Sequence, residues 1–290
     1  MSKNPSSTLQ LLRLHFSFFL MPVYWFALSQ VVDRDWGRAI LIFFILHGLV
    51  YPASNGYNSY MDRDTTPIGG LANPLQPTRQ LFWVTLAMDV TALVLSLIIG
   101  PWFTAGLAIY ILASRAYSYR GIRLKKYPII GWLTVIVCQG ALIFFIVYQG
   151  SHHPADATAS LQVPVEAMIA CSLLLGGFYP LTQVYQHEAD RSDGVRTLSM
   201  LLGYRGSFIF TGLIYSAAFL VLFYYFMLSL QIKEFEVLAT CMLPVIVYFL
   251  IWAVRVWRDP LQANFTNTMR MNLLASVCTN AGFIAILIMG

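Results

Sequence analysis

The chain has 290 residues, of which 58% are hydrophobic and only 11% are charged, against about 25% charged residues in an ordinary soluble domain. A soluble fold of this size cannot shield so much apolar surface from water, so the composition excludes a water-soluble globular domain and indicates a lipid bilayer as the solvent. The net charge of +5 does not indicate nucleic-acid binding, because the cations lie between apolar runs and form no single basic face.

The cysteines and the N-terminal segment also constrain the class of protein. Cys138, Cys171, Cys241 and Cys278 all lie inside apolar runs, so the sequence predicts neither a disulfide framework nor a cysteine metal site. Met1–Gln10 is short and polar, and no cleavage-site pattern follows the first apolar run. We therefore expect that run to be a retained membrane span and not a signal peptide.

Nine apolar runs have about the 20-residue length that crosses a bilayer as a helix. In chain order they are Leu12–Val32, Ala39–Tyr60, Leu81–Ile99, Trp102–Tyr117, Ile129–Tyr148, Val165–Tyr185, Ser207–Leu228, Val237–Val256 and Met271–Met289. Pro101 separates the third and fourth runs with almost no loop, which predicts a tight helical hairpin. The sequence thus predicts an all-α, polytopic membrane bundle of about nine helices in one domain, residues 1–290.

The distribution of Lys and Arg predicts the orientation. With nine spans and a cytoplasmic N-terminus, fifteen Lys and Arg lie on the cytoplasmic side, against Arg34, Arg38 and Lys233 on the other. This is a strong positive-inside bias. We therefore expect a multi-pass protein of a bacterial inner membrane, with cytoplasmic connections after the second, fourth and sixth spans. Ser151–Gln162, on the opposite side, is predicted to be a linker.

Two spans end in the same pattern of two amides followed by a carboxylate, at positions i, i+3 and i+7. The residues are Asn55, Asn58 and Asp62 at the end of the second span, and Gln183, Gln186 and Asp190 at the end of the sixth. This spacing places each set on one helical face. The match four spans apart predicts an internal repeat of residues 12–117 and 129–256, with the ninth span, 271–289, outside it.

Polar helix ends that simply meet the lipid headgroups are the alternative interpretation of these faces. We favour a site at the repeat interface, because unsatisfied amides in hydrocarbon are costly. Carboxylate and amide oxygens suit Mg²⁺, which commonly binds one or two carboxylates together with substrate phosphates. Arg79, the cluster Arg120–Lys126 and Arg196 could hold those phosphates. Their alternative role is anchoring to anionic lipid.

Four segments, in order, resemble motifs of the UbiA superfamily of intramembrane prenyltransferases. Ser54–Asp62 resembles its first Asp-rich motif N-D-x-x-D-x-x-x-D, Asn73–Arg79 its R-P-L-P-x-G-R loop, Tyr117–Tyr127 its Y-S-x-P-x-R-L-K-R-Y segment, and Glu188–Leu198 part of its second Asp-rich motif D-x-E-G-D-R-x-x-G-x-R-T-L. The family also has nine spans, so the resemblance covers the chain nearly end to end.

The resemblance implies a helical bundle around a lipid-open cavity in which Mg²⁺ helps an allylic diphosphate to ionise. The allylic cation then alkylates an acceptor, often an aromatic ring. The implied partners are a polyprenyl diphosphate, an unidentified acceptor and membrane lipid. The implied metal ligands are Asn55, Asn58, Asp62, Gln183, Gln186, Glu188 and Asp190; the diphosphate ligands are Arg79, Arg123, Lys125 and Arg196; and the catalytic residues are Asp62, Asp190 and Lys125.

The chain departs from the family mainly in the two Asp-rich motifs. Asn55, Asn58, Gln183 and Gln186 stand where the family has aspartates, while Asp62 and Asp190 keep the carboxylate. Each lost charge weakens cation binding by about 1–4 kcal/mol, depending on the dielectric. The amides still offer oxygen ligands, and they also offer donors that could hydrogen-bond phosphates directly. A non-catalytic relative that binds polyprenyl lipid or a partner protein is therefore the main alternative function. A transporter is weaker, because the polar faces lie at one membrane surface.

Two polar residues lie deep inside predicted spans. Asp89, in the third span, could accept a proton, bind the acceptor or form half of a buried hydrogen-bonded pair, of which we favour the pair. His47, in the second span, is expected to be a satisfied interior residue, with a base acting on an acceptor hydroxyl as its alternative role.

Overall fold

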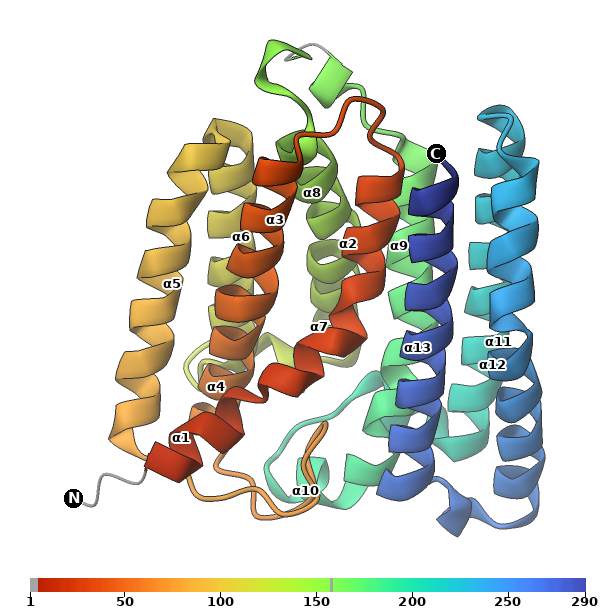
Figure 1. The fold of residues 1–290 in the computed structure, drawn as a ribbon. Helices are drawn as coiled ribbons and strands as arrows, with labels where there is room; N and C mark the ends of the chain where they lie inside the picture. The colour runs from red at the N-terminus through yellow and green to blue at the C-terminus, as the bar shows by residue number, and fades with distance from the viewer. Residues whose placement is uncertain (1–4, 157–158) are drawn as a thin grey trace.

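A computed structural model describes residues 5–156 and 159–290, and within these ranges the chain is a bundle of helices with two isolated β-bridges. Most helices run up and down side by side (Figure 1). The α-helices are α1 (Pro5–Leu12), α2 (Met21–Ser29), α3 (Trp36–Phe43), α4 (Tyr51–Asp62), α5 (Arg79–Ile99), α6 (Pro101–Ser118), α7 (Pro128–Val135), α8 (Ile143–Ser151), α9 (Val165–Phe178), α10 (His187–Ser192), α11 (Leu198–Leu228), α12 (Ile232–Arg258) and α13 (Phe265–Met289).

Eight helical segments of this described part are long and apolar enough to cross a membrane. They are Ser6–Ser29, Trp36–Asp62, Arg79–Ile99, Pro128–Ser151, Val165–Ser192, Leu198–Leu228, Ile232–Arg258 and Phe265–Met289. Four of them join shorter helices through 3₁₀ or π segments: η1 (Leu14–Leu20), η2 (Phe44–Val50), η4 (Ile136–Leu142) and η7 (Tyr179–Gln186). The short 3₁₀ turns η3 (Leu124–Lys126), η5 (Pro154–Asp156), η6 (Ala159–Leu161) and η8 (Pro260–Gln262) lie between spans.

The fourth expected span, Trp102–Tyr117, corresponds to α6, which does not meet the same criterion. It has only 18 residues and carries Arg115 and several hydroxyl side chains. It still packs with the others, beside α5, α4 and α8. The expected Ser207 start of the seventh span is also wrong: α11 begins at Leu198 and continues through a kink at Gly203, where φ is 69°.

Helix α5 shows how the bundle is arranged for lipid. Its outward side carries Val90 and Val94, whereas Asp89 and Thr85 point inward and are buried. In a bilayer, apolar side chains lose nothing by facing outward, and polar groups need partners inside the protein. Asp89 finds one in Arg115 of α6, whose Nε donates to Asp89 Oδ2 at 2.8 Å. The buried hydrogen-bonded pair that we favoured for Asp89 is therefore confirmed, and its partner is the cation Arg115.

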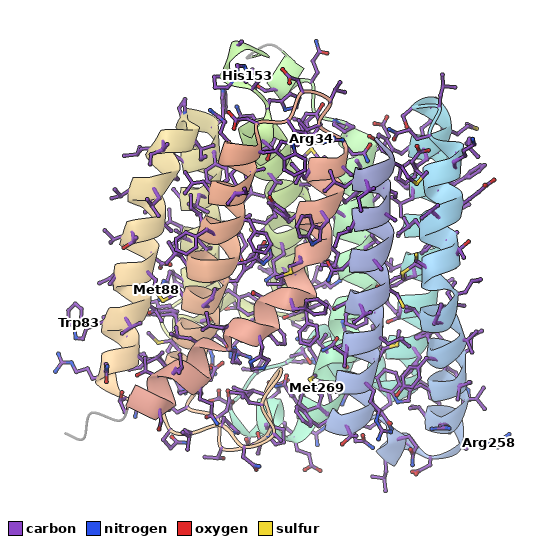
Figure 2. The ribbon with its side chains drawn as sticks, in the orientation of Figure 1. Arg34, Trp83, Met88, His153, Arg258 and Met269 are labelled. Carbon is purple, nitrogen blue, oxygen red and sulfur yellow. The ribbon has the colours of Figure 1, made fainter. Side chains whose placement is uncertain are left out.

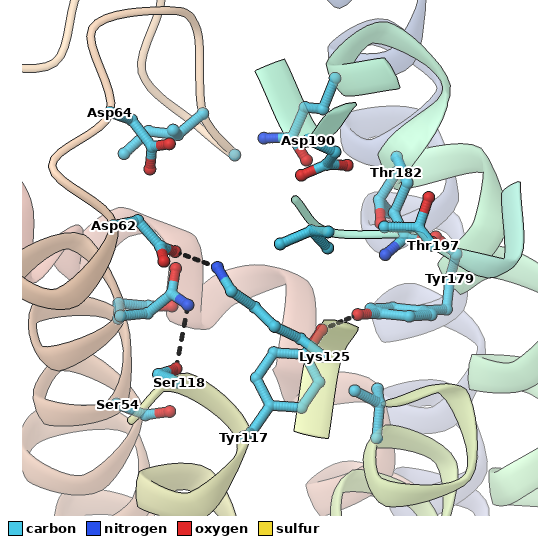
Figure 3. A pocket seen from close by; sticks show the side chains of 18 of the residues that line it. Ser54, Asp62, Asp64, Tyr117, Ser118, Lys125, Tyr179, Thr182, Asp190 and Thr197 are labelled. Atoms are coloured by element: carbon cyan, nitrogen blue, oxygen red, sulfur yellow. Dashed lines mark hydrogen bonds and ion pairs between the residues drawn. The ribbon is translucent and has the colours of Figure 1, made fainter. Parts of the chain in front are cut away.

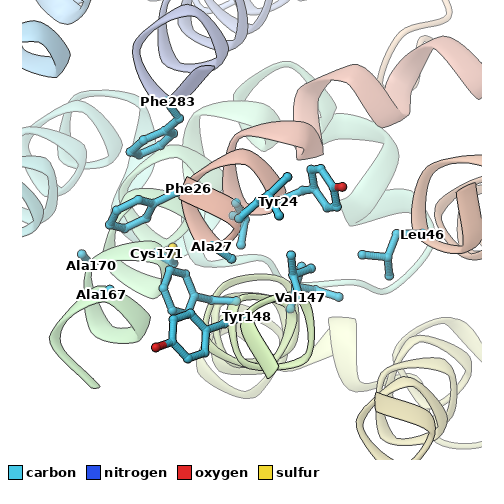
Figure 4. Packing of buried hydrophobic residues seen from close by; sticks show 14 of the residues in the cluster. Tyr24, Phe26, Ala27, Leu46, Val147, Tyr148, Ala167, Ala170, Cys171 and Phe283 are labelled. Carbon is cyan, nitrogen blue, oxygen red and sulfur yellow. The ribbon is translucent and has the colours of Figure 1, made fainter. Parts of the chain in front are cut away.

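The centre of the bundle is an apolar cluster that joins the two ends of the chain (Figure 4). Phe26 of α2 is fully buried and stacks on Phe283 of α13, with ring centroids 4.5 Å apart and planes at 13°. Ala170 and Cys171 supply small surfaces of α9 beside them. Stacked aromatic pairs of this kind add about 0.5–1.5 kcal/mol beyond the area that they bury. The cluster fixes the positions of α2, α9 and α13, which line the apolar cavity of the site.

A π-helical bulge in the fifth span reorients one polar side chain. In η4 the backbone loses the regular α-helical bonding, and Ser172 of α9 compensates: its Oγ donates to Ile136 O at 3.0 Å and accepts from Ala141 N at 3.1 Å. Gly140 permits this contact, since an added Cβ would lie 2.7 Å from the Ser172 backbone. The bulge leaves Gln139 on the wall of a cavity. Such bulges are frequent at functional sites.

Two of the three cations at the other end of the bundle are used as helix caps. Arg38 Nε donates to Gly150 O at 2.8 Å, and its Nη2 donates to Ile99 O at 2.6 Å, so it satisfies the last carbonyls of α8 and α5. Arg34 caps α2 through Leu28 O at 3.1 Å. Figure 2 shows Arg34 and His153 at this end and Arg258 at the opposite end.

We predict that Asp89→Ala strongly destabilises the protein, because Arg115 would keep a buried charge without a partner. Removing one member of a buried ion pair costs about 3–5 kcal/mol. Thermal unfolding in detergent measures the loss. Val90→Ala, on the outward side of the same turn, is the matched control and should change the free energy of unfolding by less than about 0.5 kcal/mol. Equal melting temperatures for the two variants would contradict the structural role of the pair.

Candidate active site

The end of α4 forms the first wall of the site, and hydrogen bonds to α6 hold it in place. Asn58 Nδ2 donates to Ser118 Oγ at 3.0 Å, and one turn earlier the hydroxyls of Ser54 and Ser114 are hydrogen-bonded to each other. Asp62 is the last residue of α4, and its side chain is buried. The first wall therefore presents amide and carboxylate groups from one helix end, as the spacing of these residues predicts.

The second wall is built by η7 and α10. The predicted α-helical face is wrong here, because Gln183 and Gln186 lie in a 3₁₀ helix. Pro180, near its start, lacks the N–H that an α-helix would use. A 3₁₀ helix has three residues per turn, so residues at i and i+3 still share one side. Asp190 follows in the first turn of α10, and all three side chains line the same cavity as the first wall.

Two cations of the loop between α6 and α7 link the two walls. Lys125 Nζ is ion-paired with Asp62 and reaches into the space between Asp62 and Asp190 (Figure 3). Arg123 is ion-paired with Asp193, just after α10, and its Nη2 lies 3.6 Å from Asp62 Oδ1. Partly buried ion pairs are screened less than surface pairs. The loop thus ties the end of α4 to the end of α10.

Three arginines at this end of the bundle have left-handed backbone conformations. Arg13, Arg63 and Arg123 have φ values of 48°, 56° and 52°. This conformation costs a non-glycine residue about 1–2 kcal/mol, and such strain collects at functional sites. Arg13 interrupts the first span and donates to the carbonyls of Gly69 at 3.0 Å and Asn55 at 3.2 Å. It therefore fastens the loop after α4 to the first wall.

The two walls enclose a cavity of about 240 Å³. A second cavity, of about 210 Å³, is lined mainly by apolar residues of η1, α2, α9 and α13 and extends to Phe283. The two cavities share Asn55, Gln139 and Asn272 on their walls, so they adjoin each other. The hydroxyls of Tyr117 and Tyr179 form a hydrogen bond in the first cavity (Figure 3). The site therefore passes from a polar end to an apolar end.

The polar cavity carries a net negative formal charge. Among the described residues, its lining contains the carboxylates Asp62, Asp64, Asp190 and Asp193 and the cations Arg13 and Lys125. Burial raises the pKa of the Asp64 carboxyl to about 6; the neighbouring Asp62 raises this pKa as well, and Lys125 and Arg13 lower it. The Asp64 carboxyl is thus mostly ionised at neutral pH, and the cavity attracts cations.

Several buried polar atoms of this cavity have no hydrogen-bonding partner within the described part of the protein. They are Asn55 Nδ2, Asp62 Oδ1, Gln183 Oε1 and Arg13 Nε. Unpaired buried donors and acceptors are rare in native proteins and need an explanation. They are four of the fifteen such atoms in the described part of the chain, and a polar ligand in this cavity could pair with them.

The residues present fit a magnesium ion that is shared with a substrate. The described residues contain no group of three His, Cys, Asp or Glu side chains placed to hold a metal by themselves. Mg²⁺ is usually held by one or two carboxylates plus phosphate and water oxygens, however. Asp62, whose Oδ1 accepts no hydrogen bond, and Asp190 on the facing wall supply such carboxylates. Asn58 and Gln186 supply neutral oxygens beside them.

The structure brings most of the expected site residues together. Seven of them line the polar cavity: Asn55, Asn58, Asp62, Lys125, Gln183, Gln186 and Asp190. Arg123 is not in the lining, but its Nη2 lies 3.6 Å from Asp62 Oδ1. Glu188, Arg79 and Arg196 are exposed and are not part of the cavity lining. Glu188 points away because it lies two residues before Asp190 on a helical turn. The roles of all these residues stay predictions.

Other residues of the site carry no clear signal in the sequence. Arg13 counts there only as one more cytoplasmic cation, and Gln139 and Asn272 are single amides in long apolar runs. The remaining deep polar candidate, His47, is buried among Tyr24, Phe43 and Tyr51 and does not line either cavity. The structure therefore gives no support to a role for His47 as a base.

Two curated relatives match parts of the sequence. The bacteriochlorophyll synthase 33 kDa chain of Cereibacter sphaeroides is 28% identical over 178 residues, which is 59% of this chain and 56% of that protein. The probable homogentisate phytyltransferase 2 of Oryza sativa subsp. japonica is 31% identical over 133 residues, 43% of this chain and 34% of that protein. The matched segments thus cover about half and a third of these relatives.

The fold resembles solved structures over nearly its whole length. A UbiA homologue from Archaeoglobus fulgidus bound to GPP and Mg²⁺ superposes with a TM-score of 0.68 at 19% identity, covering 97% of this chain and 99% of that one. This likeness shows the same arrangement of helices. The sequence model of the UbiA prenyltransferase family matches residues 17–274. Together with the eight apolar helices, these findings show that the chain is an integral multi-pass membrane protein that belongs to the UbiA prenyltransferase family.

Proposed function

We propose that this protein is an intramembrane prenyltransferase that moves the prenyl group of an allylic diphosphate to an acceptor. The observation that carries the proposal is a polar cavity, edged by Lys125 and Arg13, that adjoins an apolar one. A prenyl diphosphate has the matching chemistry, with a charged head and an apolar tail. The GPP-bound Archaeoglobus homologue, which has the same fold, supports this assignment.

The diphosphate would bind between the two walls. Lys125 lines the cavity and is paired with Asp62, and Arg123 lies next to the cavity and is paired with Asp193. Both cations can exchange these carboxylates for phosphate oxygens. Charge-assisted hydrogen bonds to phosphate are about twice as strong as neutral ones. Arg13 also lines this cavity, and its Nε has no hydrogen-bonding partner among the described residues. It adds positive charge near Phe16, which lines both the polar and the apolar cavity.

The acidic lining makes a divalent cation part of the proposal. A diphosphate would meet more carboxylates than cations in the empty cavity, and their repulsion opposes binding. Mg²⁺ held by Asp62 and Asp190, with oxygens from Asn58 and Gln186, would neutralise the leaving diphosphate. Lys125 would place the diphosphate oxygens against this cluster. Asn55, Gln183 and the exposed Glu188, Arg79 and Arg196 have supporting roles at most.

In the reaction, the bond between the allylic carbon and the diphosphate oxygen breaks, and the diphosphate leaves with the electron pair. The acceptor supplies the electron pair of the new bond and loses a proton. The rings of Tyr117 and Tyr179 lie beside this point and can stabilise the allylic cation through their π faces. The enclosing bundle excludes water that would otherwise capture the cation.

The names of the two matched relatives favour an acceptor that carries a ring. One is called a bacteriochlorophyll synthase and the other a homogentisate phytyltransferase. We place the cavity at the cytoplasmic face of a bacterial inner membrane, because the positive-inside bias puts that end of the bundle inside. A non-catalytic relative that only binds polyprenyl lipid is the second candidate, since four neutral amides replace aspartates of the family motifs.

We predict that Asp62→Asn, Asp190→Asn and Lys125→Met each lower prenyl transfer at least about 100-fold, the usual scale for losing one group that stabilises the leaving charge. Purified protein, Mg²⁺, radiolabelled geranyl diphosphate and a panel of ring acceptors give the rates. Glu188→Gln is the matched control: it changes a carboxylate of the same motif outside the cavity and should keep the wild-type rate. Wild-type transfer in Asp62→Asn and Asp190→Asn would remove both residues from the mechanism.

A second test concerns the amides. If Asn58 and Gln186 are metal ligands, the Asn58→Asp/Gln186→Asp double variant should bind Mg²⁺ more tightly in the presence of an unreactive thio-analogue of geranyl diphosphate. If they instead donate hydrogen bonds to phosphate, the new charges weaken binding of the analogue at every Mg²⁺ concentration. We expect the first result, because added carboxylates strengthen cation binding by about 1–4 kcal/mol each. Calorimetric titration separates the two, and unchanged affinities would make both residues bystanders.

A further inference from the structure

A third cavity lies between α11 and α12, about halfway along both helices, with Met271 near the start of α13 at its edge. Its volume is about 340 Å³, and its walls are almost entirely apolar, with Phe219, Met242, Val245 and Phe249 among them. It contains no charged side chain in the part of the protein that the structure describes. None of the steps proposed for the reaction uses this space.

Tyr215 of α11 connects this cavity to the apolar cavity of the site. It is the one described residue that lines both of them. On the side of the site, the neighbouring lining residues are Leu175 and Phe178 of α9. The cavities of the protein therefore form a series: the polar cavity, the apolar cavity that extends to Phe283, and the cavity between α11 and α12 beyond the Tyr215 ring.

The Tyr215 ring is held by packing alone. It lies against Gly177 of α9, where an added Cβ would come within 2.6 Å of its Cδ2 atom, so the glycine makes room for the ring. Among the described residues its hydroxyl has no hydrogen-bonding partner. The side chain is only partly buried, so this hydroxyl is not an unsatisfied core group. Removal or enlargement of this ring therefore changes the shape of the cavity without breaking a hydrogen bond.

We infer that Tyr215 sets the length of the prenyl chain that the site accepts, and that the cavity between α11 and α12 receives the distal isoprene units of longer chains when this ring gives way. The inference rests on the proposed function. With the head of the substrate among the polar residues, each added isoprene unit extends along the apolar cavity, whose lining reaches Phe283 and Tyr215. Phe283 is stacked on Phe26 within the core, whereas Tyr215 has free volume behind it.

The competing occupant of the third cavity is an acyl chain of the surrounding lipid. Such a chain would enter from the bilayer and would not depend on the diphosphate. The two occupants make different predictions for substrate selectivity. If an isoprene tail enters this cavity, substitution of Tyr215 changes how the affinity for a prenyl diphosphate depends on its chain length. If an acyl chain of the bilayer fills the cavity, this dependence stays the same.

The test compares wild type with Tyr215→Ala, Tyr215→Leu and Tyr215→Trp. Unreactive thio-analogues of geranyl, farnesyl and geranylgeranyl diphosphate are titrated in the presence of Mg²⁺, and the ratio of affinities for the longest and the shortest chain is the readout. Tyr215→Ala and Tyr215→Leu should raise this ratio at least about tenfold, the scale of one added apolar group in a pocket. Tyr215→Trp should lower it. Leu213→Ala, on the exposed side of the same helix, is the control and should leave it unchanged.

The outcomes are distinguishable. If wild type binds none of the three analogues, the proposed function fails, and the inference about Tyr215 fails with it. If wild type binds them but the length ratio is the same in all Tyr215 variants, only the inference fails. A change in copurified phospholipid without a change in the ratio assigns the cavity to bilayer lipid and also overturns the inference. Melting temperatures of the unliganded variants, with Tyr215→Leu as the milder truncation, show that a changed ratio does not come from unfolding.

Discussion

The ion pairs of Asp62 are the interaction on which the site depends. A buried carboxylate at the end of a membrane helix is stable only when cations face it, and here Lys125 and Arg123 do so from one loop. Because Arg123 also pairs with Asp193, the same loop fixes the distance between the two carboxylate segments. A ligand that enters must replace these pairs. Binding is therefore coupled to the position of the whole loop between α6 and α7, and not to single side chains.

The amide substitutions make physical sense beside this cluster. Asn55, Asn58, Gln183 and Gln186 face the same small cavity as four carboxylates. Aspartates at all four amide positions would add like charges to a cavity that already has more carboxylates than cations, and like charges at short range repel strongly in a low dielectric. The amides keep oxygen atoms in place at a lower electrostatic cost. Under the proposed function, they would lower the affinity for the cation and would also lower the repulsion between the charges of the cavity.

Much of the fold was predictable, because lipid imposes simple rules on a sequence. The length of the apolar runs predicted the helices. The need for partners in hydrocarbon predicted a buried hydrogen-bonded pair for Asp89, and the structure supplies Arg115 as its partner. The motif residues were predictable as a group, since Asp62, Lys125 and Asp190 do meet in one cavity. The 3₁₀ geometry of η7 was not predictable, because residues three positions apart share one side in a 3₁₀ helix much as they do in an α-helix. Arg13 was not either, because its role depends on a backbone break that no local pattern marks. The internal repeat stays a prediction.

The three cavities follow from a conflict that any enzyme for amphipathic substrates in a membrane must resolve. The charged head needs carboxylates, amides and cations, which are stable only near the membrane surface, where the loop of Lys125 can reach them. The tail needs apolar walls at greater depth. In this bundle, the break at Arg13, the bulge beside Gln139 and the small surfaces of α9 open adjoining cavities in the two environments. Polarity thus falls from Asp62 to Tyr215, and under the proposed function this gradient would orient the substrate before any specific contact discriminates between chains.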